Sequence, residues 1–311
     1  MAELIGYLLT MDAIFTWALA SLVYKWGLSK TKPKASLFFR LLFVTIGTFF
    51  FALFFGNMSL LNGQSVQTIF NYFMACAISG ISVTLGDLLF YFALRKIDVS
   101  RAYPLSQLSL IFVYPFAFIL FGEIVTLSIL IGGLLILLSV FILSTKDKDI
   151  PEENENSKTS SSKENLFIGV LLSVITAFCW GVAIVSFNQA RIIINDVFVT
   201  NFFRVFYALI GLTIVSLIKT EFLESFKKEN RKILKFYFYI AIAGILSLGL
   251  ADTLFYKAAE INGLVLTSTI TVNTPMVQQI FSILILKEKF RKRFLIAVAL
   301  IIIGNYIILF F

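Results

Sequence analysis

Long apolar runs separated by short polar segments make up most of the chain. About 20 apolar residues in a helix cross the hydrocarbon core of a membrane, and ten runs of roughly that length follow one another here. Their predicted bounds are 4–24, 36–55, 69–94, 99–121, 126–144, 166–190, 197–218, 236–259, 264–286 and 294–311. A β-barrel would instead show alternating segments of about ten residues. The pattern therefore predicts an all-α integral membrane protein with ten transmembrane helices.

One polar segment interrupts this pattern in the middle of the chain. Residues 146–165 read KDKDIPEENENSKTSSSKEN, an acidic and Ser-rich composition that is typical of a flexible linker. The segment divides the chain into a first repeat, residues 1–145, and a second repeat, residues 166–311, of five predicted helices each.

The two repeats carry the same residues at an offset of 163 to 165 positions. The stretch from Asp87 to Ala93 (DLLFYFA) returns as Asp252 to Ala258 (DTLFYKA). The other matches are Trp17 with Trp180, Phe38-Phe39-Arg40 with Phe202-Phe203-Arg204, Gly80 with Gly244, and Gly122-Glu123 with Lys287-Glu288. Self-similarity at a fixed spacing indicates a duplicated structural unit. Because each unit has an odd number of predicted helices, the second repeat enters the membrane from the opposite side.

The basic residues in the loops agree with this inverted topology. Apart from Arg40 and Arg204, which lie deep inside helices, 22 Lys and Arg residues fall in or beside loops on one side of the membrane, whereas Arg191 and Lys257 fall on the other. Loops rich in Lys and Arg stay in the cytoplasm. We therefore predict a multi-pass plasma-membrane protein with the linker in the cytoplasm and both termini outside.

Composition narrows the chemistry. The chain is 59% hydrophobic and 14% charged, whereas soluble domains carry about 25% charged residues. The net charge of +8 resides in loops beside the membrane, so it indicates topology and no nucleic-acid partner. There is no His, and Cys76 and Cys179 lie in apolar runs, so we predict no metal site, cofactor or disulfide.

The repeated unit runs Trp, Phe-Phe-Arg, Gly, Asp-x-Leu-Phe-Tyr-x-Ala and Glu, and in this it resembles the EamA family of the drug/metabolite transporter superfamily. The resemblance covers nearly the whole chain outside the linker and implies a central cavity reached by alternating access. It also implies transport of amino acids, other small metabolites or drugs, often outward. The family usually has a proline early in the fourth helix of each unit, which Pro275 supplies in the second repeat; the first repeat departs from this with Leu110, and has Pro104 and Pro115 nearby. The fourth helix of each repeat is therefore expected to bend differently.

Two arginines and two aspartates lie inside predicted helices at matching positions of the two repeats: Arg40, Asp87, Arg204 and Asp252. Charged groups at membrane depth are rare and usually paired. The depths of the four predict an Arg40–Asp87 pair toward the cytoplasm and an Arg204–Asp252 pair toward the outside. Each pair either ties neighbouring helices together or faces the cavity as a gate or substrate anchor.

Asp12 in the first helix has Thr176 as its counterpart in the second repeat. It is either an interfacial residue near the outer end of its helix or a cavity acid that binds an amine or a proton. In the second case it would be the proton-coupling residue.

Aromatic and amide residues supply the remaining candidates for a binding site. Trp17 and Trp180 lie well inside their helices, either as core packing or as cavity lining. The fourth helix of each repeat carries a polar stripe on one face, either for helix–helix hydrogen bonds or for the cavity. The stripes are Tyr103, Gln107 and Tyr114 in the first repeat and Thr267, Thr271, Thr274 and Gln278 in the second, with Asn273 a neighbour and Tyr91 and Tyr256 weaker candidates. Glu123 and Glu288 are predicted to cap helices or to bind loops.

These observations favour a secondary transporter of small metabolites, such as amino acids or related amphipathic solutes, that acts as an exporter. The expected partners are a small-molecule substrate and membrane lipid. A flippase for lipids or lipid-linked sugars is the alternative. An intramembrane enzyme is disfavoured, because an aspartyl dyad needs two carboxylates that share a proton and the two aspartates are expected near opposite faces. No catalytic residue is therefore assigned.

Overall fold

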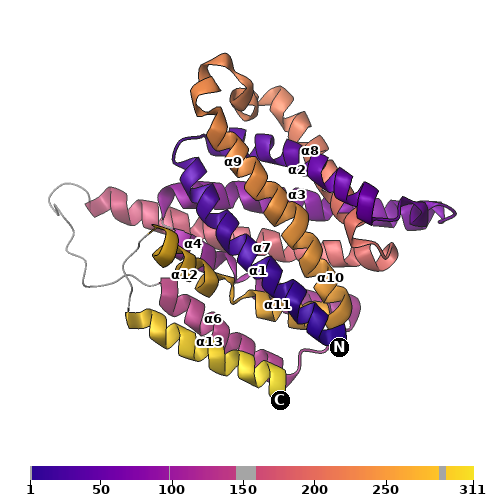
Figure 1. Cartoon of the computed structure of the whole chain (residues 1–311), viewed down its shortest axis with the longest axis vertical. Coiled ribbons are helices and arrows are strands. Elements are labelled where there is room, and N and C mark those ends of the chain that lie inside the picture. The colour runs from indigo at the N-terminus through magenta and orange to yellow at the C-terminus, as the bar shows by residue number, and fades with distance from the viewer. Residues whose placement is uncertain (1, 98, 145–158, 287–291) are drawn as a thin grey trace.

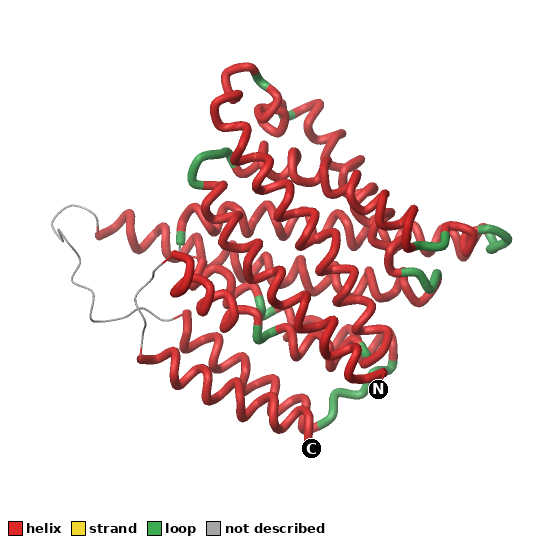
Figure 2. Tube along the Cα trace, viewed as in Figure 1, coloured by secondary structure: helices red, strands yellow, loops and turns green. Residues whose placement is uncertain are grey.

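The computed structural model describes residues 2–97, 99–144, 159–286 and 292–311. Within these residues every regular element is a helix, and the helices pack side by side into one bundle (Figures 1 and 2). Large apolar side chains cover the outside of this bundle. Phe54, Ile119 and Ile218, for example, are 71%, 71% and 81% exposed. An apolar exterior of this kind is suited to contact with lipid, as the sequence predicts.

The first repeat contains six α-helices and one short 3₁₀ helix. They are α1 (Ala2–Leu28), α2 (Pro33–Phe55), η1 (Met58–Leu61), α3 (Val66–Lys96), α4 (Val99–Ser106), α5 (Ser109–Phe121) and α6 (Leu127–Ser144).

The second repeat has the corresponding order of helices. They are α7 (Thr159–Ile193), α8 (Val197–Ile218), η2 (Thr220–Phe226), η3 (Lys228–Ile233), α9 (Leu234–Gly244), η4 (Ile245–Ala251), α10 (Asp252–Asn262), α11 (Leu264–Thr271), α12 (Thr274–Leu286) and α13 (Lys292–Phe310). Residues 159–165, predicted as part of the linker, thus already belong to α7. The other residues of the predicted linker, 146–158, lie outside the described residues.

Seven stretches of the described chain are long and apolar enough to cross a membrane. Two shorter apolar helices, Leu127–Ile142 and Phe294–Phe310, accompany them. These two lie beside each other as α6 and α13 (Figure 1).

The fourth predicted helix of each repeat is broken, so the prediction of one continuous helix over 99–121 and over 264–286 is wrong. A turn at Gln107 and Leu108 separates α4 from α5, and a turn at Val272 and Asn273 separates α11 from α12. Both turns are closed by tight backbone hydrogen bonds from residue i to i−3. The breaks fall at equivalent positions even though only the second repeat has a proline directly after its break, Pro275.

The two repeats interlock and do not form separate domains. Helix α3 runs along α7, α2 packs against α8 and α9, and α1 packs against α10. One buried cluster accordingly mixes Leu37 and Ala93 of the first repeat with Val205 and Ile240 of the second. Helices of both repeats therefore meet around the middle of the bundle, where the conspicuous charged residues lie.

Candidate functional site

A cavity of about 130 Å³, wide enough for water-sized molecules, lies where the two repeats meet. Its wall is mostly aromatic and aliphatic, with contributions from Phe90, Val113 and Phe255. Four charged side chains, Arg40, Asp87, Arg204 and Asp252, also border it. The cavity thus combines a large apolar surface with two oppositely charged pairs, which is a suitable lining for an amphipathic solute.

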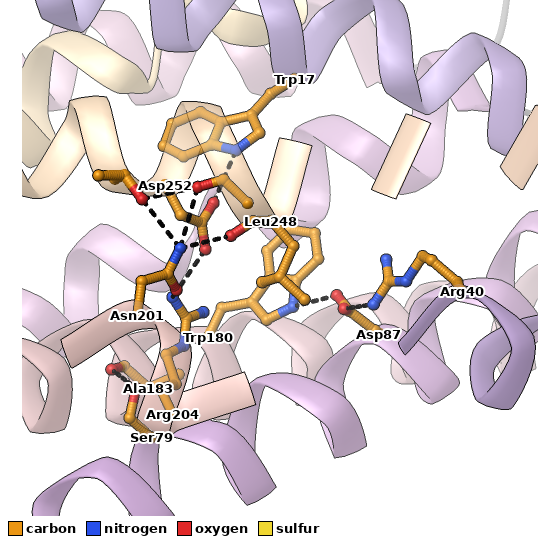
Figure 3. Close-up of polar contacts among 12 residues, drawn as sticks. Trp17, Arg40, Ser79, Asp87, Trp180, Ala183, Asn201, Arg204, Leu248 and Asp252 are labelled. Carbon is orange, nitrogen blue, oxygen red and sulfur yellow. Dashed lines mark hydrogen bonds and ion pairs between the residues drawn. The ribbon is translucent and has the colours of Figure 1, made fainter. Parts of the chain in front are cut away.

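The four charged residues form two ion pairs, each within one repeat (Figure 3). Arg40 Nη2 donates to Asp87 Oδ2, joining α2 to α3. Arg204 Nη1 donates to Asp252 Oδ2 over 2.8 Å, joining α8 to α10. The two arginines are 2% and 1% exposed. An unpaired charge would be costly at such a depth, and each arginine compensates the charge of its aspartate.

Each of the two carboxylates also accepts a hydrogen bond from a tryptophan of the opposite repeat. Trp180 Nε1 donates to Asp87 Oδ1 over 3.1 Å, and Trp17 Nε1 donates to Asp252 Oδ1 over 2.9 Å (Figure 3). Each carboxylate therefore gives one oxygen to its own arginine and the other to the partner repeat. The sequence repeats the tryptophan at an offset of 163 positions and the aspartate at an offset of 165, but it carries no signal that α1 meets α10 or that α7 meets α3.

Both guanidinium groups lie over aromatic rings of their own repeat. The Arg40 guanidinium carbon is 5.4 Å from the ring centres of both Tyr24 and Tyr91. The Arg204 guanidinium carbon is 5.3 Å from the Phe187 ring and 5.8 Å from the Tyr256 ring. Such contacts stabilise a desolvated cation and hold each arginine to the helices of its own repeat.

Three polar atoms beside the cavity have no hydrogen-bond partner among the described residues: Arg40 Nε, Arg204 Nε and the Tyr91 hydroxyl. The Ser268 hydroxyl, on α11, also has no hydrogen-bond partner among the described residues. Buried polar groups normally have partners. These groups are therefore buried in the wall of the cavity with unused capacity for hydrogen bonds.

A π-helix, η4, precedes Asp252 and was not predicted from the sequence. A single nitrogen, Nδ2 of Asn201, lies 3.0 Å from the carbonyl oxygens of Leu248 and Gly249 and 3.0 Å from Thr253 Oγ1. A π-helix shifts the hydrogen-bond pattern of a helix and often marks a functional site. Asn201, one turn before Arg204 on α8, satisfies the carbonyl groups at this shift.

Seven of the other candidate residues from the sequence line the cavity: Trp17, Trp180, Tyr91, Tyr103, Gln107, Tyr256 and Thr271. Ser247, Ser268 and Tyr24 also line it but lack any motif in the sequence that would have singled them out.

The candidates that are not part of the wall are Asp12, Tyr114, Thr267, Asn273, Thr274 and Gln278. Asp12 is exposed on α1, which separates it from the cavity it was expected to serve. The Asn273 amide exchanges hydrogen bonds of 3.0 and 3.1 Å with Asn305, bracing the break between α11 and α12. Gln278 donates to Ser282 Oγ over 2.8 Å. The Asn273 amide thus makes a contact with α13, whereas the hydrogen bond of Gln278 stays within α12.

Glu123 acts as a helix cap, but not for the helix that follows it. Its two carboxylate oxygens accept hydrogen bonds from the backbone N–H groups of Leu264 and Val265, at 3.1 and 2.8 Å. It thereby caps α11 of the second repeat, where an anion is favourable. Its counterpart Glu288 lies outside the described residues.

Comparison with known proteins gives a consistent class. A model of the EamA-like transporter family matches residues 4–145 and 167–310. The chain is 23% identical over 305 residues to an uncharacterized transporter of Archaeoglobus fulgidus, with 97% of each protein covered. It is also 31% identical over 145 residues to a probable 4-amino-4-deoxy-L-arabinose-phosphoundecaprenol flippase subunit, ArnF, of Yersinia enterocolitica, covering 45% of this chain and 94% of that protein.

A crystal structure of similar fold is also known. It matches with a TM-score of 0.70 and 16% sequence identity, covering 98% of this chain and 95% of that one. At this level of identity the likeness concerns the fold alone.

Proposed function

The chain belongs to the EamA-like transporter family, as its repeated motifs predict, and we propose that it is a secondary transporter that moves small amphipathic metabolites by alternating access. The observation that carries this proposal is the cavity between the repeats, with its aromatic wall and two ion pairs. Inverted repeats place a solute site near the membrane midplane at their interface.

The proposed architecture has ten membrane crossings arranged as two inverted five-helix repeats. Seven crossings are the long apolar stretches of the structure. We assign the other three to α6, α13 and the broken pair α11–α12. The linker is then cytoplasmic and both termini are outside, an orientation supported by the distribution of Lys and Arg in the loops.

The proposed substrate class follows from the lining of the cavity. An apolar or aromatic body fits the wall formed by Trp17, Phe90 and Trp180. A carboxylate would find the unpartnered donors Arg40 Nε and Tyr91 Oη, and an ammonium group would find the two aspartates. Amino acids and related zwitterions have all three features, and we propose that the protein exports such solutes.

A flippase for lipid-linked sugars is the second candidate function, favoured by the similarity to the ArnF subunit over 45% of this chain. It differs from solute export in its substrate, which keeps a lipid tail in the membrane while its head group crosses. A cavity that opens sideways between helices would serve that function.

Ligand-induced stabilisation of the purified protein tests the proposal. A ligand that binds only the native state raises the free energy of unfolding by about 2.7 kcal/mol at one hundred times its Kd. We expect amino acids with apolar side chains to raise the melting temperature of the wild type and to do so less for Tyr103→Leu, which alters the cavity wall. The matched control is Tyr306→Leu, because Tyr306 is 55% exposed on α13.

Flux measurements in proteoliposomes then separate the two candidate functions. Efflux of an unmodified stabilising amino acid supports export. Stabilisation by lipid-linked sugars alone, together with their movement between leaflets, would replace the export proposal with the flippase.

A further inference from the structure

The polar contacts around the cavity fall into two kinds. The ion pairs Arg40–Asp87 and Arg204–Asp252 join residues of the same repeat. The bonds Trp180–Asp87 and Trp17–Asp252 join residues of different repeats (Figure 3). Rigid-body rocking of one unit against another changes contacts between units and keeps those within a unit. The two kinds of contact therefore have different fates in a transport cycle.

We propose that the two crossed Trp–Asp hydrogen bonds are the latches of the transport cycle, one for each side of the membrane. This inference rests on the proposed alternating-access function. It assigns the release step to the indole N–H groups of Trp17 and Trp180 and leaves the arginines as fixed partners of their aspartates.

The geometry of the carboxylates supports this division of labour. In each aspartate Oδ2 is bound by arginine and Oδ1 by tryptophan. Loss of the indole therefore leaves the charge of the carboxylate compensated by its arginine. The latch can open without exposing an unpaired charge, whose cost would otherwise block the movement.

The arginines are also held in place by their own repeats. The Arg40 guanidinium lies against Tyr24 and Tyr91, and the Arg204 guanidinium lies against Phe187 and Tyr256. Each indole contacts one ring of the opposite repeat, Trp17 with Phe255 at 5.6 Å and Trp180 with Phe90 at 5.3 Å between ring centres. The indole is neutral and forms one hydrogen bond to its aspartate, so releasing it separates no pair of opposite charges. The crossed bonds are thus the weaker and the more reversible of the two kinds.

The two latches serve different faces of the membrane. Asp87 lies nearer the end of α3 that finishes at Lys96, in a basic loop. Asp252 lies on α10, which ends at Asn262 on the other side of the bundle. In the proposed orientation the Trp180–Asp87 bond closes the cytoplasmic side, and the Trp17–Asp252 bond closes the outer side. In this structure both bonds are formed.

Phenylalanine substitutions separate the latch from simple packing. Trp17→Phe and Trp180→Phe keep an aromatic ring but remove the N–H donor. Trp26→Phe is the matched control, because the third tryptophan is 48% exposed on α1 and contacts Phe236 and Tyr239 outside the cavity. Gly86→Ala is an independent probe, since its added Cβ would lie 2.7 Å from Trp180 Cδ1 and displace the indole without removing it.

The readout is the reaction of a cavity cysteine with a membrane-impermeant thiol reagent, applied from one side at a time. The cysteine is placed at Ser268, which lines the cavity, after the buried Cys76 and Cys179 are replaced by Ala. We expect Trp17→Phe to raise labelling from outside about tenfold, corresponding to 1.4 kcal/mol. Trp180→Phe and Gly86→Ala should raise labelling from the cytoplasmic side, and Trp26→Phe should change neither.

Equal labelling in all variants, or an increase on the same side for both tryptophans, would overturn the latch assignment. Solute efflux by the wild type, measured in parallel, tests the proposed function by itself. A transporting wild type with unresponsive variants rejects the latches alone, whereas a wild type without flux rejects the transport function even if labelling shifts. Melting curves of every variant verify that labelling reports on folded protein.

Discussion

The two repeats agree in their charged centres and differ in the backbone that carries them. Both have an arginine over two rings, an aspartate bound by that arginine, and a tryptophan that donates a hydrogen bond to the aspartate of the other repeat. In the first repeat the aspartate lies on α3, a continuous α-helix from Val66 to Lys96. In the second it follows the π-helix η4. The contacts that the repeats share are those that the proposed transport cycle requires on each side of the membrane. The geometry of the helix that carries the aspartate is not shared.

Two residues account for much of this divergence. Asn201, which satisfies the π-helix carbonyls, has Leu37 as its first-repeat counterpart. Ser247, within the π-helix, shares a hydrogen bond of 2.5 Å with Tyr24 of the first repeat. The second repeat therefore contains a polar support for irregular backbone that the first repeat lacks. This asymmetry makes η4 the element whose hydrogen bonds can rearrange.

The largest expected effect comes from breaking the feature that the repeats share. Arg40→Ala and Arg204→Ala each leave a buried carboxylate with only an indole partner, which should cost about 3–5 kcal/mol of unfolding free energy. The double variants Arg40→Ala/Asp87→Ala and Arg204→Ala/Asp252→Ala should recover most of the loss, because no unpaired charge remains. Unfolding in mixed detergent micelles measures both. A loss below 1 kcal/mol in either repeat would show that its pair is dispensable.

The sequence predicted the pairs but not the crossed tryptophans, for a physical reason. Arg40 and Asp87 lie in neighbouring segments of one repeat at similar depths, so helix length and loop charge bring them together. The Trp17–Asp252 contact depends on how the repeats interlock, which involves helices 235 positions apart in the sequence. The periodicity of a helix shows on which face a residue lies, but it does not show which other helix packs against that face.

The breaks in the fourth helices were missed for a related reason. Proline alone was taken as the signal, and Pro275 indeed follows one break. The break at Gln107 and Leu108 has Pro104 three residues earlier, inside α4. The capped start of α11, where Glu123 reaches across from the first repeat, likewise depends on tertiary contact. Local sequence gives the tendency to bend, and packing decides the residue at which the helix ends.

Glycine substitutions test whether the close contacts between repeats are equally rigid. A Cβ at Gly80 would lie 2.1 Å from the backbone oxygen of Arg204, whereas one at Gly244 would lie 2.3 Å from Arg40 Cγ. Overpacking costs about 1–3 kcal/mol, and a backbone atom yields less than a side chain. Thermal unfolding should therefore show a larger loss for Gly80→Ala than for Gly244→Ala. Gly211→Ala is the control, because its nearest atom is 4.0 Å away; the reverse order would mean that α8 adjusts more easily than the Arg40 side chain.

Replacing Asn201 by leucine, the residue at the equivalent position of the first repeat, tests whether the amide supports the π-helix η4. Asn201→Leu removes the donor to the Leu248 and Gly249 carbonyls, an expected loss of about 1–2 kcal/mol. Hydrogen exchange should accelerate in 245–251 and leave α3 unchanged. The control is Asn188→Leu, which removes an amide from α7 that contacts Arg191 and not the π-helix. Unchanged exchange in 245–251 would show that the π-helix is stable without its amide support.

The N-cap residues of α2 and α8 occupy equivalent positions of the two repeats but have opposite charges, and their replacement is expected to have a smaller effect on stability. Asp196 caps α8 through the N–H groups of Phe198 and Val199, at 2.9 Å each, and accepts from Asn57 N over 2.7 Å. Lys32, its counterpart, makes no capping bond and pairs with Glu224 over 2.8 Å. Asp196→Ala should cost about 1 kcal/mol, whereas Lys32→Ala should leave the melting temperature unchanged. Equal losses would mean that the exposed ion pair replaces the cap.

The smallest expected effect concerns the loops on the basic side, where Lys34 pairs with Glu221. The hydrogen bond and positive charge of Lys34 lower the pKa of the Glu221 carboxyl below its usual value. A carboxyl with a lowered pKa in the folded state stabilises it above the pKa of the unfolded chain, and this contribution disappears as the pH falls through the lowered value. The difference in melting temperature between wild type and Glu221→Gln should thus be constant from pH 7 to about 5 and shrink below about pH 4. It should also shrink in 1 M salt, which screens exposed charges. A difference that persists under both conditions would assign the effect to packing of η2 on α2 and remove electrostatics from the contrast between the two sets of loops.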